Sequence, residues 1–140
     1  MLTTIERATE NFCIHQIRKE HNMNEGISKK STLIAYIDIQ TESKIKYRVY
    51  IASEKSFMQR ISTLFLEEEE SDEETLIDML LETTNLIVGS AKVLAEEENK
   101  NPYIINTPHF EKIDVFDFDY DSAKTVSIED DQLTIAIKEL

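Results

Sequence analysis

The 140-residue sequence contains one cysteine, few basic residues and no long apolar run. Cys13 cannot form a disulfide within the chain, which agrees with a reducing compartment. Because it falls among apolar positions of a predicted helix, we interpret Cys13 as a small buried residue. No stretch approaches the ~20 apolar residues that a membrane-spanning helix needs, and the N-terminal segment MLTTIERATE lacks the basic-then-apolar order of a signal peptide. These absences predict a cytoplasmic protein.

Positive charge is scarce, since 15 lysine and arginine residues face 28 aspartate and glutamate residues and leave a net charge of −13. An anionic surface repels the phosphates of nucleic acids and of anionic lipids. We therefore expect neither nucleic acid nor a membrane surface as a partner. With 41% hydrophobic and 31% charged residues, the length suits one globular domain that spans residues 1–140.

Glycine and proline are also rare, with two of each in the chain. Both prolines lie between Asn99 and Pro108, and this segment is therefore predicted to be irregular or to form a sheet edge. The two glycines are Gly26 and Gly89. Gly89 falls in the middle of a predicted helix, where glycine costs about 1 kcal/mol relative to alanine. A bare backbone at that point would let another surface come close.

The longest regular pattern runs from Ser71 to Glu98 and predicts a helix over about residues 73–98. Ser71 and Glu74 have the spacing of a capping box, in which the two side chains satisfy free backbone N–H groups at a helix start. At roughly 100° per residue, the apolar and small side chains of this helix form one stripe that faces the core. The stripe consists of Leu76, Ile77, Leu80, Thr84, Ile87, Val88, Ala91, Leu94 and Ala95.

A second stripe of the same helix is not explained by packing. It contains Asp78, Glu82, Asn85, Gly89 and Lys92. Glu82 and Asn85 are at positions i and i+3, so their Cβ atoms lie roughly 5–6 Å apart. Asp78 lies one turn before this pair and Gly89 one turn after it. A solvated face explains the pattern as well, because acidic helices often contain an acid and an asparagine at this spacing by chance.

Two further helices are predicted on either side of the strands described below. Thr3 and Glu6 form another capping box, at the start of a helix over about residues 4–20. Ser53 is a candidate cap for a helix that ends at the acidic run 67–70, because four adjacent glutamates repel one another and prefer water. The apolar side of this helix consists of Phe57, Ile61, Leu64 and Phe65.

Strands are predicted in the first and last thirds of the chain. Residues 32–40 and 44–52, joined by a short polar link, predict an antiparallel hairpin. Residues 113–120 predict a strand whose apolar face switches between Val115 and Phe116, which indicates a bulge or burial on both sides. Residues 133–137 alternate and predict the last strand. The order of elements gives an α+β domain in which two or three helices cover a largely antiparallel sheet.

The run Asp78-x-x-x-Glu82-x-x-Asn85, which continues into LIVGSAK with Gly89 and Lys92, resembles the signature helix of the CheC/CheX/FliY family of chemotaxis phosphatases. The likeness is greatest to the CheX branch. Members of this family remove the phosphoryl group from an aspartate of the response regulator CheY. The order of the elements also matches CheX-like proteins, and residues 106–109 resemble the proline-containing segment that precedes their next strand. The resemblance implies a CheX-like fold and a hydrolase that acts on CheY or a related receiver domain.

The resemblance also implies roles for single residues. Asn85 would orient the attacking water, and Glu82 would bind the active-site lysine of the response regulator. Asp78, Gly89 and Lys92 would contact the partner. No metal or cofactor of the protein's own is implied, and a Mg²⁺ ion is expected on the phosphorylated regulator.

One active site is expected. In the CheC branch of the family, a second acidic-x-x-Asn pair is expected on the first helix. Here Glu10 is followed by Cys13 at this spacing, and Asn11 is preceded by Ala8, so neither residue completes such a pair.

The family also bears on assembly. CheX-like proteins are expected to form homodimers through their sheets, and the strand 133–137 could offer an edge for this pairing. Two features depart from the family pattern. Thr83 and Thr84 stand where apolar or small residues are expected, and the shortage of glycine puts the tight turns between strands in doubt.

Other functions fit parts of the sequence. A protein of the same fold could bind a receiver domain, or act as an adaptor of the flagellar switch, without hydrolysis. An acidic secretion chaperone is also a small α/β protein. His109 is interpreted as a surface or structural residue, and His15 and His21 are too remote in sequence to predict a zinc site with it. The run 67–74 lacks the spaced ligands and the glycine of a calcium loop, which favours a solvated segment.

Overall fold

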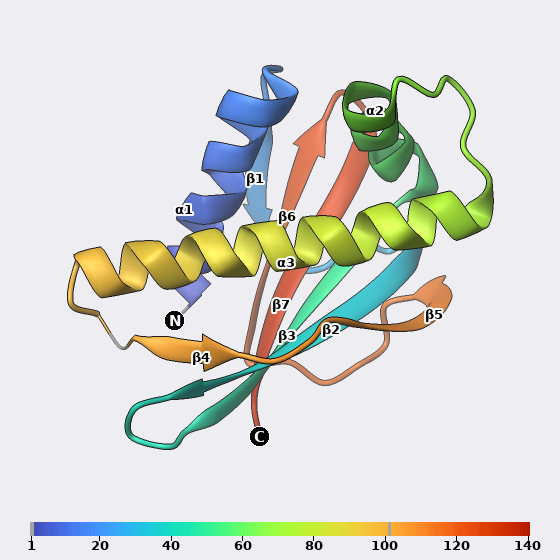
Figure 1. Cartoon of the computed structure of the whole chain (residues 1–140). Coiled ribbons are helices and arrows are strands. Elements are labelled where there is room, and N and C mark those ends of the chain that lie inside the picture. Colours follow the sequence, from blue (N-terminus) through green and yellow to red (C-terminus); the bar gives the residue numbers. More distant parts are fainter. Residues whose placement is uncertain (1, 101) are drawn as a thin grey trace.

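The computed structural model describes residues 2–100 and 102–140. Its helices lie on one face of a single antiparallel sheet, and the longest helix crosses the strands (Figure 1). The elements are α1 (Leu2–Phe12), the π-helix η1 (Cys13–Ile17), β1 (Asn22–Glu25), β2 (Ser31–Thr41), β3 (Lys46–Ser53), α2 (Lys55–Leu66), α3 (Glu73–Glu97), β4 (Tyr103–Ile105), β5 (His109–Val115), β6 (Ser122–Ile128) and β7 (Asp131–Glu139). The α+β class and the helix-covered antiparallel sheet are confirmed.

The sheet has the strand order β1-β6-β7-β3-β2-β4, and β5 pairs with another part of β2 on the same side as β4. The β2–β3 hairpin is confirmed, with Tyr36 opposite Tyr50 at its centre. β7 lies between β6 and β3, with Ile135 opposite Ile51. The expectation that residues 133–137 offer a sheet edge is therefore wrong. The edges are formed by β1 on one side and by β4 and β5 on the other.

The sheet is buried on both faces, which accounts for the nearly continuous apolar run in β2. Leu33, Ala35 and Ile37 pack into the large core beneath the helices. Ile34 faces the other way, into a smaller cluster with Tyr50. This cluster is covered by the chain that follows β5. The buried members of the smaller cluster are Ile34, Tyr50, Ala52, Phe116, Ala123 and Ala136.

The strand predicted at residues 113–120 is displaced in the structure. β5 begins at His109 and ends at Val115, after which the chain leaves the sheet. Phe116 and Phe118 fold over the second face, with ring centroids 5.3 Å and 4.9 Å from that of Tyr50. The switch of the apolar pattern at Phe116 thus marks the end of the strand rather than a bulge. The irregularity in the β2–β5 pairing lies earlier, between Ile34 and Ala35.

Helix α3 confirms the predicted span to within one residue, but its cap is not the expected one. The N-cap is Asp72, whose Oδ1 accepts the backbone N–H of Thr75 at 2.8 Å and whose pKa is lowered by this bond. The predicted capping box of Ser71 and Glu74 is therefore wrong. Ser71 contacts the hydroxyl of Ser62 on α2 instead, so a tertiary contact has taken the side chain that the local pattern assigned to the cap.

The other two predicted caps are also wrong. Thr3 lies inside α1, which includes Leu2, so Thr3 does not precede the helix. The first helix widens into η1 and ends at Arg18, which has the left-handed φ of 60°. Ser53 is the buried last residue of β3, and the N-cap of α2 is Glu54, without a side-chain cap bond. The helix start differs from the predicted one by about two residues in α1 and by one residue in α2.

Helix α2 buries less of its apolar side than predicted. Phe57 and Ile61 are fully buried, as expected, whereas Leu64 and Phe65 remain 47% and 38% exposed. The prediction that the acidic run ends this helix is confirmed, because Glu67 adopts a left-handed φ of 58° directly after Leu66.

No helix in the described ranges is long and apolar enough to span a membrane. Cys13 is 1% exposed, which confirms its interpretation as a buried residue.

The interpretation of the segment between the prolines as edge-like is confirmed, because β4 forms a short strand beside the end of β2. β1 and β6 were not predicted as separate strands. β1 has the sequence NMNE, in which the one apolar residue, Met23, packs against the core. The segment therefore shows little apolar alternation. It pairs with β6, where Met23 lies opposite Val126.

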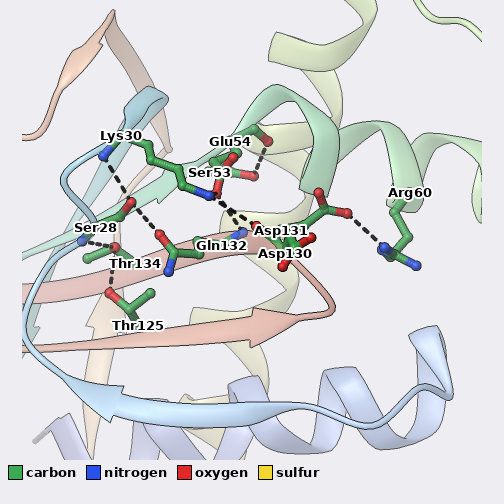
Figure 2. A network of polar contacts seen from close by, with 10 residues as sticks. All are labelled: Ser28, Lys30, Ser53, Glu54, Arg60, Thr125, Asp130, Asp131, Gln132 and Thr134. Carbon is green, nitrogen blue, oxygen red and sulfur yellow. Dashed lines mark hydrogen bonds and ion pairs between the residues drawn. The ribbon is translucent and has the colours of Figure 1, made fainter.

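A polar network fixes the start of α2 to the turn between β6 and β7 (Figure 2). Glu54 accepts the backbone N–H of Gln132 at 2.9 Å, and Gln132 accepts the hydroxyl of Ser28 at 2.7 Å. Arg60 on α2 donates to Asp131 at 2.7 Å. Burial by itself raises the pKa of Asp131, but hydrogen bonds from Ser56 and Arg60 outweigh it, so the pKa lies below its usual value. The network holds α2 in place beside the start of α3, where Lys55 donates to Glu73 at 2.9 Å.

Candidate functional site

The second stripe of α3 lies on the solvent side of the helix. Asp78, Glu82 and Asn85 are exposed, and Gly89 and Lys92 are half-buried. The opposite side is buried against the sheet and the other helices, as predicted from the 3.6-residue period. Figure 1 shows α3 in front of the strands, with one long side turned outward. A partner can therefore reach the acid and the amide directly.

Glu82 and Asn85 form a compact pair on this side. Their spacing of three residues places the two side chains one above the other, roughly 5–6 Å apart at Cβ. Within the described ranges neither side chain has a hydrogen bond or an ion pair. Asp78 stands one turn before Glu82, also exposed. The arrangement presents a carboxylate, which accepts hydrogen bonds, beside an amide, which both accepts and donates.

Asn85 also forms one wall of an open hollow. The other wall is the connection between β4 and β5, from Ile105 through Pro108 to His109. The backbone N–H of Asn106 donates to the carbonyl of Asp38 on β2 at 2.9 Å, which holds this connection at the sheet edge. The amide thus lies between the outer side of α3 and a segment some twenty residues later in the chain.

Lys92 is not brought next to Glu82 and Asn85. It lies ten residues beyond Glu82, which corresponds to about 15 Å along the helix axis. There it lines a separate hollow with Thr41 and Tyr103, and its Nζ is 3.9 Å from Glu96. The stripe read from the sequence therefore divides into a part around Asn85 and a part near β4.

Gly89 leaves a gap in the exposed side of α3. A Cβ atom built at this position would meet no heavy atom within 4 Å. Packing within the protein therefore does not require glycine here. The residue keeps the helix backbone accessible one turn after Asn85.

The two threonines that depart from the family pattern are accommodated in the core. Thr83 and Thr84 are fully buried. The hydroxyl of Thr84 donates to the carbonyl of Leu80 at 2.8 Å, and that of Thr83 lies 3.8 Å from the sulfur of Met58. Their polar atoms are satisfied without any change on the outer side, so the departure does not affect Glu82 and Asn85.

Sequence reasoning missed two features that position this site. Tyr103 is buried, and its hydroxyl donates to the carbonyl of Val88 at 2.9 Å, which ties β4 to α3 one turn after Asn85. Burial raises the pKa of Tyr103. The second feature is the hollow itself, with Asn106 and Thr107 opposite Asn85. The apolar run of β4 was a signal for a buried tyrosine, whereas no local pattern indicated the hollow.

His109 has a structural environment. Its ring centroid lies 5.4 Å from that of Tyr36, its neighbour across the β2–β5 pairing. The ring of Tyr36 in turn lies against Arg48, whose Cζ is 4.1 Å from the ring centroid.

On α1, Glu10 is 3.4 Å from His21, and Asn11 is exposed. In the described ranges no three histidine, cysteine, aspartate or glutamate side chains are grouped so that they could hold a metal ion.

Comparison with protein families identifies the chain. The family model described as "Chemotaxis phosphatase CheX" matches residues 35–128, which is more than half of the chain. The chain belongs to the CheX family. The match includes β2 from Ala35 onward, β3, α2 and all of α3 with Asp78, Glu82 and Asn85. The resemblance stated for the α3 motif is thereby confirmed at the level of the family, as is the CheX-like branch.

Solved structures show the same fold. Chemotaxis protein CheX from Vibrio vulnificus matches with a TM-score of 0.82 at 16% identity, covering 99% of this chain and 98% of that one. The complex of CheX with CheY, BeF3 and Mg²⁺ from Borrelia burgdorferi matches with a TM-score of 0.70 at 15% identity, covering 99% and 97%. FliY from Thermotoga maritima matches with a TM-score of 0.60 at 15% identity, covering 97% and 84%. No curated protein matches this CheX-family chain in sequence.

Proposed function

We propose that this CheX-family protein is a phosphatase that hydrolyses the aspartyl phosphate of a CheY-like response regulator. The observation that carries the proposal is the exposure of Glu82 and Asn85, one turn apart, on the outer side of α3. The family match and the existence of a solved CheX–CheY complex in Borrelia burgdorferi support it.

The chemistry needs little beyond positioning. An aspartyl phosphate is an activated acyl phosphate, and in the regulator a bound Mg²⁺ and a lysine neutralise its phosphoryl oxygens. The barrier that remains is the placement of a water in line with phosphorus. The Asn85 amide suits this task, since its oxygen can accept a hydrogen bond from the water while its NH₂ group donates to the phosphoryl group.

Glu82 sets the register of the complex in this proposal. Its carboxylate pairs with the lysine of the regulator, and a charge-assisted hydrogen bond of this kind is stronger than a neutral one. Asp78 and Gly89 contact the partner on either side of the pair, and Lys92 contacts it at the far end of the stripe. The Mg²⁺ belongs to the regulator, and the phosphatase supplies no metal or cofactor.

The test is release of inorganic phosphate from purified, phosphorylated receivers. A substoichiometric amount of this protein should release more than one phosphate per molecule and shorten the lifetime of the phosphorylated receiver. Complex formation without any change in that lifetime would instead support a non-catalytic receiver-binding or flagellar-switch adaptor of the same fold. The family match favours these two functions over an acidic secretion chaperone.

Location and assembly complete the proposal. We place the protein in the cytoplasm with its receiver, and we expect a homodimer. Because β7 is central, sheet-to-sheet pairing would use β1 on one edge or β4 and β5 on the other. The mass of the protein in solution, measured by light scattering, tests the dimer.

Substitution of Gly89 separates the stability of α3 from docking. Gly89→Ala should raise the free energy of unfolding by about 0.5–1 kcal/mol, because alanine is the better helix former and its Cβ meets open space. The same methyl group lies one turn from Asn85, so affinity for the receiver should fall although the protein is more stable. Urea unfolding and a binding titration measure the two effects. Unchanged affinity would mean that the partner does not approach the backbone at Gly89.

A further inference from the structure

The connection between β4 and β5 is held in a defined place opposite Asn85. Ile105 pairs with Ile39 at one end and His109 with Tyr36 at the other. Between them, the N–H of Asn106 donates to the carbonyl of Asp38 at 2.9 Å. Pro108 adds a residue with a restricted φ. The segment is thus anchored to β2 at its start, through Ile105 and Asn106, and at its end, through His109. It forms a fixed wall of the hollow.

The side chains of this wall are suited to hydrogen bonding. Asn106 and Thr107 are exposed, and both line the hollow that Asn85 lines from the other side. Within the described part of the chain neither side chain donates or accepts a hydrogen bond. Together they offer an amide and a hydroxyl, which can donate to and accept from the main chain of another protein. Neither carries a charge that would repel a phosphoryl group.

We propose that Asn106 and Thr107 form a second docking wall that hydrogen-bonds the receiver beside its phosphorylated aspartate. This inference rests on the proposed function and adds to it a contact surface outside α3. A single exposed helix touches a partner along one line, which leaves rotation of the partner about that line unrestrained. Contacts on the far side of the hollow remove this rotation and lengthen the life of the complex, while Asn85 by itself positions the water.

The partner surface follows from the chemistry of the wall. An amide and a hydroxyl recognise main-chain N–H and C=O groups, so the receiver contributes a loop with free backbone groups rather than a charged helix. Ile105 and Pro108, which also line the hollow, contact apolar atoms of the same loop. The wall therefore acts on affinity and on the choice of receiver, while Asn85 acts on the water.

The experiment measures binding and hydrolysis for the double variant Asn106→Ala/Thr107→Ala. With a receiver carrying beryllofluoride in place of the phosphoryl group, the Kd should rise about tenfold, the size expected for the loss of two hydrogen bonds. In turnover with phosphorylated receiver, KM should rise by a similar factor and kcat should stay close to that of the wild type. Asn24→Ala on β1, an exposed asparagine at the opposite sheet edge, is the matched control and should keep the wild-type Kd.

A second variant tests whether the receiver enters the hollow, by filling it instead of removing hydrogen bonds. Thr107→Tyr fills the hollow without removing the Asn106–Asp38 backbone bond, and it should weaken binding at least as much as the double variant. Wild-type Kd and KM for both variants, with an active wild-type enzyme, would overturn the second wall and leave the proposed function intact. A wild-type protein that neither binds nor dephosphorylates receivers would instead remove the proposed function and, with it, this inference.

Discussion

Asn85→Ala is expected to lower kcat for phosphate release by about a hundredfold, because the attacking water is then no longer held in line with phosphorus. Displacement of a reacting group by about 1 Å can cost that much. The amide is exposed, and it lies at the wall of the hollow rather than in the core. Its removal should leave the fold and most of the affinity intact. Single-turnover release of phosphate from the receiver, at saturating phosphatase, measures the step directly.

Asn11→Ala is the matched control for this prediction. Like Asn85, Asn11 is an exposed asparagine on a helix, here α1, where a two-site member of the family would be expected to carry its second amide. Because Glu10 and Asn11 lack partners at the required spacing, Asn11→Ala should keep full activity. Equal kcat for Asn85→Ala and the wild type would refute the catalytic role of Asn85. A loss shared by both variants would refute the single-site expectation.

Glu82→Gln is expected to weaken binding to the phosphorylated receiver by roughly thirtyfold or more, since loss of one partner of a desolvated charge pair costs about 2 kcal/mol or more. The substitution keeps the size of the side chain and removes its charge. Glu82 has no ion pair of its own within the described ranges, so the change breaks no contact inside the protein. Titration of the beryllofluoride-bound receiver gives the Kd.

Glu97→Gln controls for the change in net charge. Glu97 is also exposed on α3, but it lies fifteen residues beyond Glu82, about 22 Å along the axis. Its Kd should match that of the wild type. Salt screens exposed charge pairs more than buried ones. The difference in Kd between the two variants should therefore persist at high salt if the ion pair at Glu82 is buried in the complex, and shrink if the pair is exposed to solvent. A Glu82→Gln variant that binds like Glu97→Gln would exclude the ion pair with the regulator.

Helix ends show how local patterns fail. The spacing of Ser71 and Glu74 fits a capping box, yet Asp72 caps α3 while Ser71 meets Ser62 on α2. Asp72 and Ser71 are both good cap residues, and the sequence contains no information on which hydroxyl a neighbouring helix will reach. The choice was made by the packing of α2 against α3, which local reasoning does not include.

Strand positions show a second limit of prediction from local sequence patterns. Residues 133–137 alternate as an edge strand with one solvated face would, but β7 lies between β6 and β3. Alternation reports which side of a strand is apolar, and it does not report which strands lie beside it. At Phe116 the apolar pattern continued after the strand had ended, because the aromatic residues that follow cover the second face of the sheet.

The sequence by itself determined α3, its buried stripe and the exposed pair Glu82 and Asn85, because the 3.6-residue period links spacing to direction within one rigid element. Only the tertiary structure decided that Lys92 lies apart from this pair and that Asn106 and Thr107 stand opposite Asn85. These relations join segments whose distance depends on how β4 and β5 pair with β2. No local period carries that information.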